Sequence, residues 1–519
     1  MDLIGSLVKQ SIKLKKLTDW ESGTPLQQQI RQLRKLLTKA EFTEFGLHHD
    51  FGMILKSHKK QDPKAIYRQF AKNVPTFNYN KLHKEWWYKT LEGKEDICWP
   101  GRIKYFALSS GTSEASTKYI PITRDIAKAN QITSIRQITT LSYYDLPSDF
   151  FLKGILMLGG STNLKYNGIY YEGDLSGIQA SMIPFWFRPF YKPGKKIARE
   201  ADWAHKLEEI TKKAPEWDIG VIVGVPAWIQ IQLEKIIEYH KLNNIHEIWP
   251  NFKVFGHGGV SFEPYKKTFE KLLGKPLIYM ETYMASEGFI AYQARPNTKG
   301  MKLALDNKIF FEFVPFDEAN FNADGDMVAN PDTYLIDEID LNRDYALLLS
   351  TCAGTWRYLI GDVVRLIDRE HSEIIITGRT KHYISLCGEH LSVENMNQAI
   401  SLVANELNTP INEFAVAGVP DGSLFSHKWF IGCENPETID KELIFRRIDE
   451  HLKVLNDDYR VERSAALKQV FGEVLPLHYF YDFMKLRGKI GAQSKFPRVL
   501  KSKQLEDFEA FIAAKKAAH

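Results

Sequence analysis

The chain has 519 residues, more than one hydrophobic core usually supports, so we expect more than one domain. Hydrophobic residues make up 44% and aromatic residues 13% of the sequence, which argues against a disordered chain. A formal net charge of +4 with no dense tract of lysine and arginine gives no reason to expect a nucleic-acid partner.

The first two thirds of the chain predict an α/β domain. Residues 1–72 have apolar side chains at helical spacing. From 103 to about 380, short apolar runs alternate with helical segments, a pattern typical of a substantially parallel sheet. We expect strands at 155–158, 219–223, 254–255, 277–280, 308–313, 345–350 and 362–367. We expect helices at 122–141, 202–213, 226–241 and 263–273.

The pattern changes after Gly378 and Arg379, where a compact α+β unit is predicted. No Pro/Ser-rich linker separates the two parts, so the sequence favours a tight hinge over a flexible tether. The helices expected in this part are 391–405, 436–453 and 503–517, and the strands are near 413–418, 428–433 and 475–481.

The cysteines indicate a reducing compartment. Cys98, Cys352, Cys387 and Cys433 lie far apart and form no CxxC pair, which argues against a disulfide framework and a zinc site. The N-terminus lacks the pattern of a signal peptide, and there is no run of about 18 apolar residues. We therefore expect a soluble, cytoplasmic protein that does not enter a membrane.

A loop rich in small hydroxyl residues follows the apolar run 106–108. Backbone N–H groups and hydroxyls of such a loop can surround phosphate oxygens, and a lysine adds a positive charge for the same anion. A run of this composition is often an ordinary loop, so the rest of the chain must decide. The residues concerned are Ser109, Ser110, Gly111, Thr112, Ser113 and Lys118.

Further stretches supply what ATP-dependent activation of an acid requires. The strand that ends at Gly258 and Gly259 lets a flat ligand approach the backbone. Tyr283 can stack on adenine, and Glu287 offers a carboxylate oxygen to a hard cation. Asp362 can accept two hydrogen bonds from ribose hydroxyls.

Each of these residues also has a purely structural interpretation. Asp362 can cap a turn after Gly361, and Glu287 can cap a helix that begins at Ser286. His257 is more often a packed loop residue than a catalyst. The combination and order of the motifs are hard to explain by structure alone.

The chain resembles the adenylate-forming ligase superfamily, and within it the acyl-acid amido synthetases of the plant auxin-responsive (Gretchen Hagen) family and their bacterial relatives. The resemblance spans nearly the whole chain. It implies an α/β fold in which a large N-terminal domain of packed sheets and helices, residues 1–380, performs adenylation. It also implies a smaller, mobile α+β C-terminal domain, residues 381–519, with the active site between the two.

The resemblance implies ATP, Mg²⁺, an acyl-adenylate intermediate and an amino acid as acceptor. Ser109 to Ser113 and Lys118 match the phosphate loop, and Lys495 matches a lysine that approaches the α-phosphate. The other matching residues are Gly258, Gly259 and Val260 of the adenine-side loop, Tyr283, Ser286 and Glu287 of the metal-binding motif, the ribose-binding Asp362, and Arg379 and Lys381 at the domain junction.

Two positions depart from the superfamily pattern. Glu114 and Ala115 stand where glycine is common after the hydroxyl run, and a carboxylate beside a triphosphate is repulsive unless it turns outward or meets the metal. Lys381 occupies a hinge position that is often aspartate elsewhere.

The sequence indicates where the acid binds but not which acid it is. The expected pocket walls are Trp186, in an aromatic run, and Trp228, near the start of a helix. Arg188 can meet a second carboxylate on the substrate, although a surface arginine is the commoner interpretation. The segment 159–163 is a further candidate for the wall.

The sequence leaves several functions open. An acid–thiol ligase that forms an acyl-CoA shares the same first half-reaction. A serine hydrolase would need G-x-S-x-G and a P-loop NTPase G-x-x-x-x-G-K-[ST], and the chain contains neither motif. A non-catalytic binding protein is disfavoured because Lys118, Glu287, Asp362 and Lys495 are all present. The oligomeric state is also open, and a monomer is compatible with the sequence.

Overall fold

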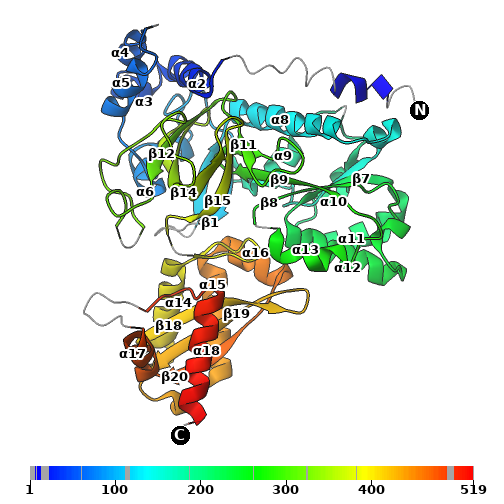
Figure 1. Cartoon of the computed structure of the whole chain (residues 1–519), viewed down its shortest axis with the longest axis vertical. Helices are drawn as coiled ribbons and strands as arrows, with labels where there is room; N and C mark the ends of the chain where they lie inside the picture. The colour runs from blue at the N-terminus through cyan, green and yellow to red at the C-terminus, as the bar shows by residue number, and fades with distance from the viewer. Residues whose placement is uncertain are drawn as a thin grey trace. The chain divides into compact units, whose positions relative to one another are not determined.

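The structure is a computed structural model that describes residues 6–7, 9–12, 23–59, 61–110, 117–185, 187–260, 262–322, 325–381, 383–487 and 496–517. Among the described residues, those up to 109 together with 118–380 form one compact unit, and those from 381 onward, with residues 110 and 117, form a second (Figure 1).

Short helices form the start of the first unit. Helix α2 (Pro25–Ala40) begins at a capping box in which Thr24 and Gln27 exchange hydrogen bonds, which satisfies open N–H groups at the helix start. The amide oxygen of Gln29, on the buried face, accepts a hydrogen bond from the backbone of Phe311 at 2.7 Å and so ties the helix to the sheet. The following helices are α3 (Glu44–His48), α4 (Phe51–Lys56), α5 (Ala65–Asn73), α6 (Tyr79–Leu82) and α7 (Tyr88–Leu91), with a π-helical turn at His83–Trp87.

The largest sheet of the first unit has eleven strands among the described residues. In order across the sheet they are β12 (Ile309–Pro315), β13 (Asp344–Thr351), β14 (Thr355–Asp368), β15 (Glu373–Arg379), β11 (Met301–Leu303), β10 (Gly288–Tyr292), β9 (Ile278–Ala285), β8 (Val254–Gly258), β7 (Ile219–Gly224), β3 (Gly154–Met157) and β6 (Tyr191–Lys192). Strands β9, β8, β7, β3 and β6 are parallel. The strands from β12 to β9 pair antiparallel.

A smaller sheet and several helices complete this unit. The smaller sheet has the order β2 (Thr117–Ile122), β1 (Tyr105–Ser110), β5 (Tyr171–Gly173) and β4 (Lys165–Tyr166). The helices are α8 (Arg124–Thr139), α9 (Leu175–Ser181), α10 (Lys195–Ala198), α11 (Trp203–Lys213), α12 (Pro226–His240) and α13 (Glu263–Glu270). The four helices predicted between 122 and 273 are confirmed, because α8, α11, α12 and α13 lie within the predicted ranges.

The α/β class and the substantial parallel part of the sheet are confirmed, and one strand is longer than predicted. The sheet is mixed, because only its β9-to-β6 half is parallel. The strand predicted at 277–280 continues to Ala285, because its second half pairs antiparallel with β10 in a hairpin. The first half of the strand pairs with β8 and the second half with β10, so the run is extended over its whole length, whatever its apolar content.

The second unit is an α+β unit with its own core. Its strands are β16 (Tyr383–Ile384), β17 (Leu391–Ser392), β18 (Glu413–Asp421), β19 (Leu424–Cys433) and β20 (Leu467–Pro476), the last three forming one sheet. Its helices are α14 (Val393–Glu406), α15 (Lys441–Leu455), α16 (Asp457–Ala465), α17 (Leu477–Leu486) and α18 (Ser502–Ala517). Phe480, Phe483, Phe496 and Phe508 form the centre of a buried cluster against the sheet.

The strand predicted near 475–481 is wrong beyond Pro476. Strand β20 ends at Pro476, and helix α17 follows at once. Tyr479, Phe480, Phe483 and Met484 are its buried residues, a spacing that fits one helix face rather than the two-residue period of a strand.

A buried carboxylate organises the segment between β16 and β17. Glu389 is fully buried, and its oxygens accept the backbone N–H groups of Leu386 and Cys387 at 2.9 and 2.8 Å. His427 of β19 donates to it through Nε2 at 2.9 Å. Burial alone would raise the pKa of Glu389, but these hydrogen bonds, that of His427 foremost, lower it to about 2.

We therefore expect Glu389→Gln to loosen this segment at neutral pH. Because the folded-state pKa lies below the ordinary value of 4.5, the stabilisation is present above that value and is lost as the pH falls towards 2. A shift of this size corresponds to roughly 3 kcal/mol. The measurement is hydrogen-exchange protection of the Leu386 and Cys387 amides in both proteins at about pH 7 and about pH 3. Equal losses of protection at the two pH values would contradict the interpretation.

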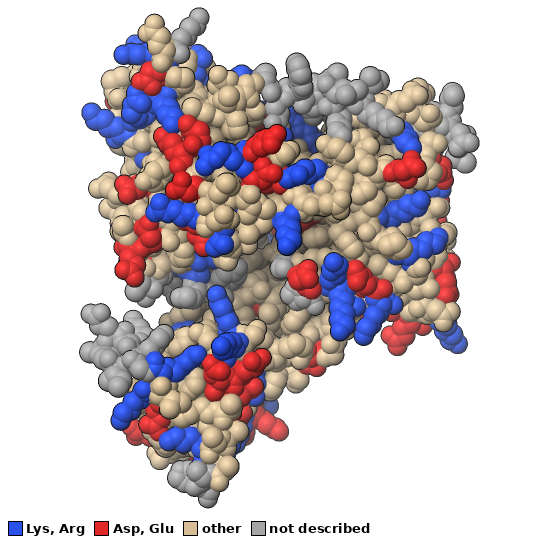
Figure 2. Space-filling model, viewed as in Figure 1, with Lys and Arg blue, Asp and Glu red and all other residues tan. Residues whose placement is uncertain are grey.

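The surface of the viewed face carries both charges interspersed (Figure 2). The protein also has ion pairs near its surface, for example Lys153 with Asp218 at 2.9 Å, and such pairs contribute little to stability. Cys98, Cys352, Cys387 and Cys433 are buried free thiols. None of the helices among the described residues combines the length and the apolar character of a membrane span.

Candidate active site

The β9–β10 hairpin carries three of the predicted site residues. Ala285 pairs with Gly288, so Ser286 and Glu287 form the turn between the strands. This excludes the alternative in which Glu287 caps a helix that begins at Ser286. Although it lies in a turn, Glu287 is only 7% exposed, because its side chain turns into the protein.

Asp362 holds two predicted site residues together. It lies in strand β14 opposite Arg379 of β15, and Arg379 Nε donates to its Oδ1 at 2.6 Å. The Tyr283 hydroxyl donates to its Oδ2 at 2.6 Å. Burial, followed by the Asp362 charge, raises the pKa of Tyr283 well above its usual range, so the phenol keeps its proton. Each carboxylate oxygen has about two acceptor positions, which leaves capacity for a further donor.

The Glu287 carboxylate is buried, and the nearby positive charge and hydrogen bonds offset only part of the cost of burying its negative charge. Burial raises its pKa, while the nearby Lys118 and a hydrogen bond from the Tyr358 hydroxyl lower it. The Asp362 charge raises the pKa further, so two carboxylates repel each other here. Lys118 of β2 lies with Nζ 5.6 Å from the centre of the Tyr79 ring.

A buried ion pair anchors the strand that carries Tyr358 and Asp362. Arg357 is 5% exposed and has a positive φ of 41°, a conformation that side chains rarely adopt without support. Its Nε donates to both oxygens of Glu312 at 3.0 and 3.1 Å, and its Nη1 donates to the Val74 carbonyl at 2.8 Å. The pair fixes the β14 backbone beside the candidate site.

The structure thus brings together Lys118, Tyr283, Glu287, Asp362 and Arg379, all of which the sequence singled out. Ser109 and Ser110 end strand β1, and Lys118 lies near the start of β2. Three further predictions, Gly111, Thr112 and Ser113, fall outside the described residues, as do Glu114, Ala115, Trp186 and Lys495.

The carboxylate of Glu287 suits a hard divalent cation. Its raised pKa shows that the described groups around it leave the negative charge undercompensated. No cluster of three or more potential metal-binding side chains occurs among the described residues. Mg²⁺ does not need one, because it keeps several waters and binds one or two carboxylates together with substrate phosphates.

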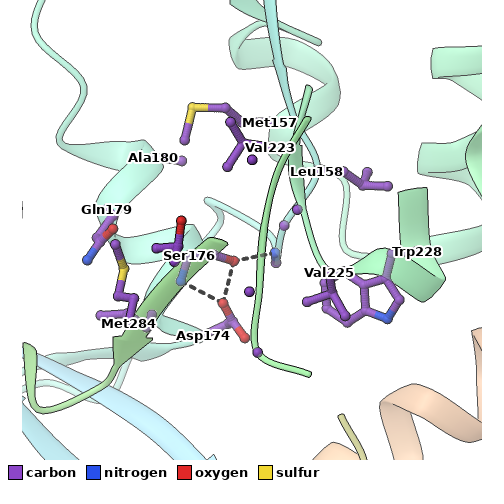
Figure 3. A pocket seen from close by; sticks show the side chains of 18 of the residues that line it. Met157, Leu158, Asp174, Ser176, Gln179, Ala180, Val223, Val225, Trp228 and Met284 are labelled. Atoms are coloured by element: carbon purple, nitrogen blue, oxygen red, sulfur yellow. Dashed lines mark hydrogen bonds between the residues drawn. The ribbon is translucent and has the colours of Figure 1, made fainter. Parts of the chain in front are cut away.

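A cavity of about 300 Å³ lies beside the ends of β3, β7 and β8 (Figure 3). Thr282 and Met284 of β9 line it, whereas Tyr283 between them contacts Asp362. Trp228 of α12 and the glycines Gly258 and Gly259 line it as well. Its remaining walls include apolar residues such as Met157, Leu158, Ala180, Val223 and Val225, and the segment that follows β3, Gly159 and Gly160.

Only glycine fits at position 258 of strand β8. A Cβ at this position would lie 2.3 Å from the Thr282 carbonyl, so no other residue fits without moving the backbone.

His257 lines the cavity but is packed among aromatic rings. It is 6% exposed and lies 4.8 Å from Phe262, centre to centre. Burial lowers its pKa to about 4, so it is neutral near pH 7. Its Nδ1 is buried without a hydrogen-bond partner among the described residues. The side chain belongs to strand β8 rather than to a loop.

Two further predicted residues of the first unit do not line the cavity. Arg188 is exposed, and neither it nor Val260 is among the residues that line the cavity. Lys381 follows Thr380, whose N–H donates to the Gly361 carbonyl at 2.9 Å. Gly361, within strand β14, has a φ of 95°, which only glycine adopts easily.

Sequence reasoning missed Tyr358 and Lys206. Tyr358 is hydrogen-bonded to Glu287, but it lies outside the strand predicted at 362–367, so nothing in the sequence placed it beside Glu287. Lys206 lines the cavity from α11, yet in the sequence it is one of several lysines of an amphipathic helix. Nothing in the local pattern distinguishes it.

Three family models match the chain. They are described as the GH3 family N-terminal domain, matching residues 15–207 and 166–278, the GH3 family central domain, matching 302–373, and the GH3 family C-terminal domain, matching 394–504.

Curated relatives match parts of the chain. Jasmonoyl–L-amino acid synthetase JAR6 of Nicotiana attenuata is 29% identical over 57% of this chain and 60% of its own length. Indole-3-acetic acid-amido synthetase GH3.2 of Arabidopsis thaliana is 30% identical over 24% of this chain and 23% of its own length. The chain therefore spans about a quarter to three fifths of the curated relatives described here.

Solved structures share the fold over nearly the whole chain. The GH3.15 acyl acid amido synthetase aligns with a TM-score of 0.57 at 17% identity, covering 97% of this chain and 96% of its own. A 2-hydroxyisobutyryl-CoA ligase in complex with 2-HIB-AMP and CoA aligns with a TM-score of 0.55 at 12% identity, covering 94% of this chain and 91% of its own.

Proposed function

The chain belongs to the GH3 family, and on this premise we propose that it is an ATP-dependent acyl-acid amido synthetase. It adenylates a small carboxylic acid and transfers the acyl group to an amine, namely an amino acid, with release of AMP and pyrophosphate. The names of the relatives JAR6 and GH3.2, both amino acid or amido synthetases, support this choice.

The observation that carries the proposal is the arrangement around strand β9. Tyr283 contacts Asp362 on one side, and its neighbours Thr282 and Met284 line the cavity. A nucleotide bound at Asp362 and an acid bound in the cavity would then share one strand. Successive side chains of a strand point to its opposite faces, so an attack of the carboxylate on the α-phosphate would require the two ligands to meet at the end of β9.

In the first half-reaction, an oxygen of the acid attacks the α-phosphorus of ATP and pyrophosphate leaves. Asp362 accepts hydrogen bonds from the ribose, Tyr283 packs on the adenine, and Lys118 offsets phosphate charge. Glu287 is the residue that would hold Mg²⁺, and the ion would offset charge on the phosphate oxygens. In the second half-reaction, the amine nitrogen attacks the acyl carbonyl, AMP leaves, and the amine loses a proton.

The domain roles are part of the proposal. Residues 1–380 form the adenylation domain, and residues 381–519 form the C-terminal domain that carries Lys495. Lys381 lies at the hinge between them, and Lys495 approaches the α-phosphate during adenylation. A cytoplasmic location belongs to the proposal as well, because the reaction consumes ATP and the four cysteines are free thiols.

The test is acid-dependent pyrophosphate release over a panel of acids, followed by product analysis with amino acids and with coenzyme A. The proposal expects release with at least one acid and an amide product with an amino acid. Thioester formation with coenzyme A in place of the amide would identify an acid–thiol ligase instead. Absence of release with every acid would contradict both.

A further inference from the structure

The cavity contains one buried lysine that the proposed reaction does not use. Lys206 of α11 lines it and is 3% exposed. Its Nζ donates to the Gly159 carbonyl at 3.2 Å and lies 5.9 Å from the centre of the Trp203 ring. An ammonium group has three donors, so its hydrogen-bonding capacity is only partly used.

The described carboxylates do not neutralise this lysine. Burial lowers the pKa of Lys206, and the charges of Asp174 and Glu200, which raise it, do not make up the difference. Asp174 also lines the cavity, but its Oδ1 accepts the N–H of Ser176 at 2.7 Å and the Ser176 hydroxyl at 2.5 Å (Figure 3). Its charge is thus directed at the start of α9.

A second hydrogen-bond donor lies in the same cavity wall. The Nε2 atom of Gln179, on α9, is buried and has no hydrogen-bond partner among the described residues. A buried donor without an acceptor costs free energy. Lys206 and Gln179 therefore favour a ligand that brings acceptor atoms into an otherwise largely apolar cavity.

Lys206 lies away from the side where adenylation is proposed, because its partner Gly159 stands at the other edge of the cavity. Gly159 follows β3, whereas Gly258 ends β8, and strand β7 lies between the two. Neighbouring strands are about 4.8 Å apart, so the two edges of the cavity are separated by about 10 Å. A benzene ring or a short alkyl chain between two end groups spans a distance of this order.

Resting on the proposed function, we propose that the acid substrate carries a second carboxylate, which binds Lys206 at the far end of the cavity. The substrate class is thus a small dicarboxylic acid, with one carboxylate adenylated and the other paired with Lys206. Arg188, the cation that the sequence suggested for a second carboxylate, is exposed and does not line the cavity.

The experiment compares matched acids that differ in one carboxylate: benzoate with terephthalate, and hexanoate with adipate. Pyrophosphate release is measured for wild type, Lys206→Met and Lys206→Arg. Lys212→Met, on the exposed side of the same helix, is the matched control. We expect wild type to prefer the diacid of a pair, and Lys206→Met to reduce that preference about 10- to 100-fold in kcat/KM.

Lys206→Arg should keep much of the preference, Lys212→Met all of it, and activity with the monoacids should remain in Lys206→Met. A wild-type preference for the monoacid in both pairs, or an unchanged preference in Lys206→Met, would overturn the inference. Calorimetric binding of each diacid without ATP separates the two proposals. If no acid releases pyrophosphate, the proposed function fails, while a diacid that binds wild type but not Lys206→Met still supports the lysine's role.

Discussion

Replacing Glu287 by glutamine should lower acid-dependent pyrophosphate release by about 100- to 1,000-fold, the scale seen when one electrostatic partner of a transition state is removed. Glutamine keeps the size of the side chain and its contact with Tyr358 but lacks the charge that a hard cation requires. The measurement is the rate at limiting and at saturating Mg²⁺. Tyr358→Phe, which keeps the carboxylate, is the control and should lose far less activity.

The raised pKa of Glu287 also predicts how the rate of adenylation depends on pH. Because burial raises the pKa of Glu287, its protonation on acidification begins at a higher pH than that of an ordinary glutamate. We expect adenylation to decline in that range and added Mg²⁺ to shift the decline to lower pH. Wild-type rates for Glu287→Gln at limiting Mg²⁺ would remove the metal assignment.

Glu287 should also reduce the stability of the unliganded protein at neutral pH. A carboxyl whose folded-state pKa is raised stabilises the fold below its ordinary pKa and loses that contribution as the pH rises through the raised pKa. Glu287→Gln should therefore raise the melting temperature near neutral pH and have less effect in acid. A melting temperature lowered at neutral pH would show that the carboxylate stabilises the fold instead.

Replacing Asp362 by alanine should weaken ATP binding by about 10- to 100-fold, since a hydrogen bond to a charged acceptor contributes roughly 1.5–3 kcal/mol. The variant also leaves Arg379 and the Tyr283 hydroxyl without their shared acceptor. Loss of ATP binding alone would not separate a direct contact from a misplaced Tyr283.

A comparison of nucleotides separates these two effects. Wild type should discriminate strongly between ATP and its 2′,3′-dideoxy analogue, and Asp362→Ala should discriminate far less. Tyr283→Phe, which removes the hydroxyl that contacts Asp362 but keeps the carboxylate, should keep the discrimination. Equal discrimination by wild type and Asp362→Ala would refute a ribose contact.

The sequence predicted those parts of the fold whose signal is local. Helix α12, for example, begins at Pro226 and follows a strong apolar pattern, and the structure has it where the pattern placed it. Residues 477–481 were predicted as part of a strand, because a run such as Leu477 to Phe483 is apolar enough for either the strand or the helix period. Only the packing of Phe480 and Phe483 against the second unit's core selects the helix.

The candidate site likewise contains residues that a local sequence motif predicts and a residue that no local motif predicts. Tyr283, Glu287 and Asp362 were found because each stands in a recognisable motif, although they are as far as 79 residues apart in the chain. Lys206 was not found, because its significance depends on the carbonyl of Gly159, which the fold brings beside it from 47 residues away. Such a contact depends on the tertiary fold and has no signature in the neighbouring residues.

The central claim is that the acid is activated as an acyl-adenylate. The most direct measurement uses an accepted acid with heavy-oxygen-labelled carboxylate and follows the label into the products by mass spectrometry. If the carboxylate attacks the α-phosphorus, one labelled oxygen must leave with the AMP when the amine takes the acyl group. The account predicts labelled AMP and unlabelled pyrophosphate. ADP with labelled phosphate, or AMP without label, would contradict it.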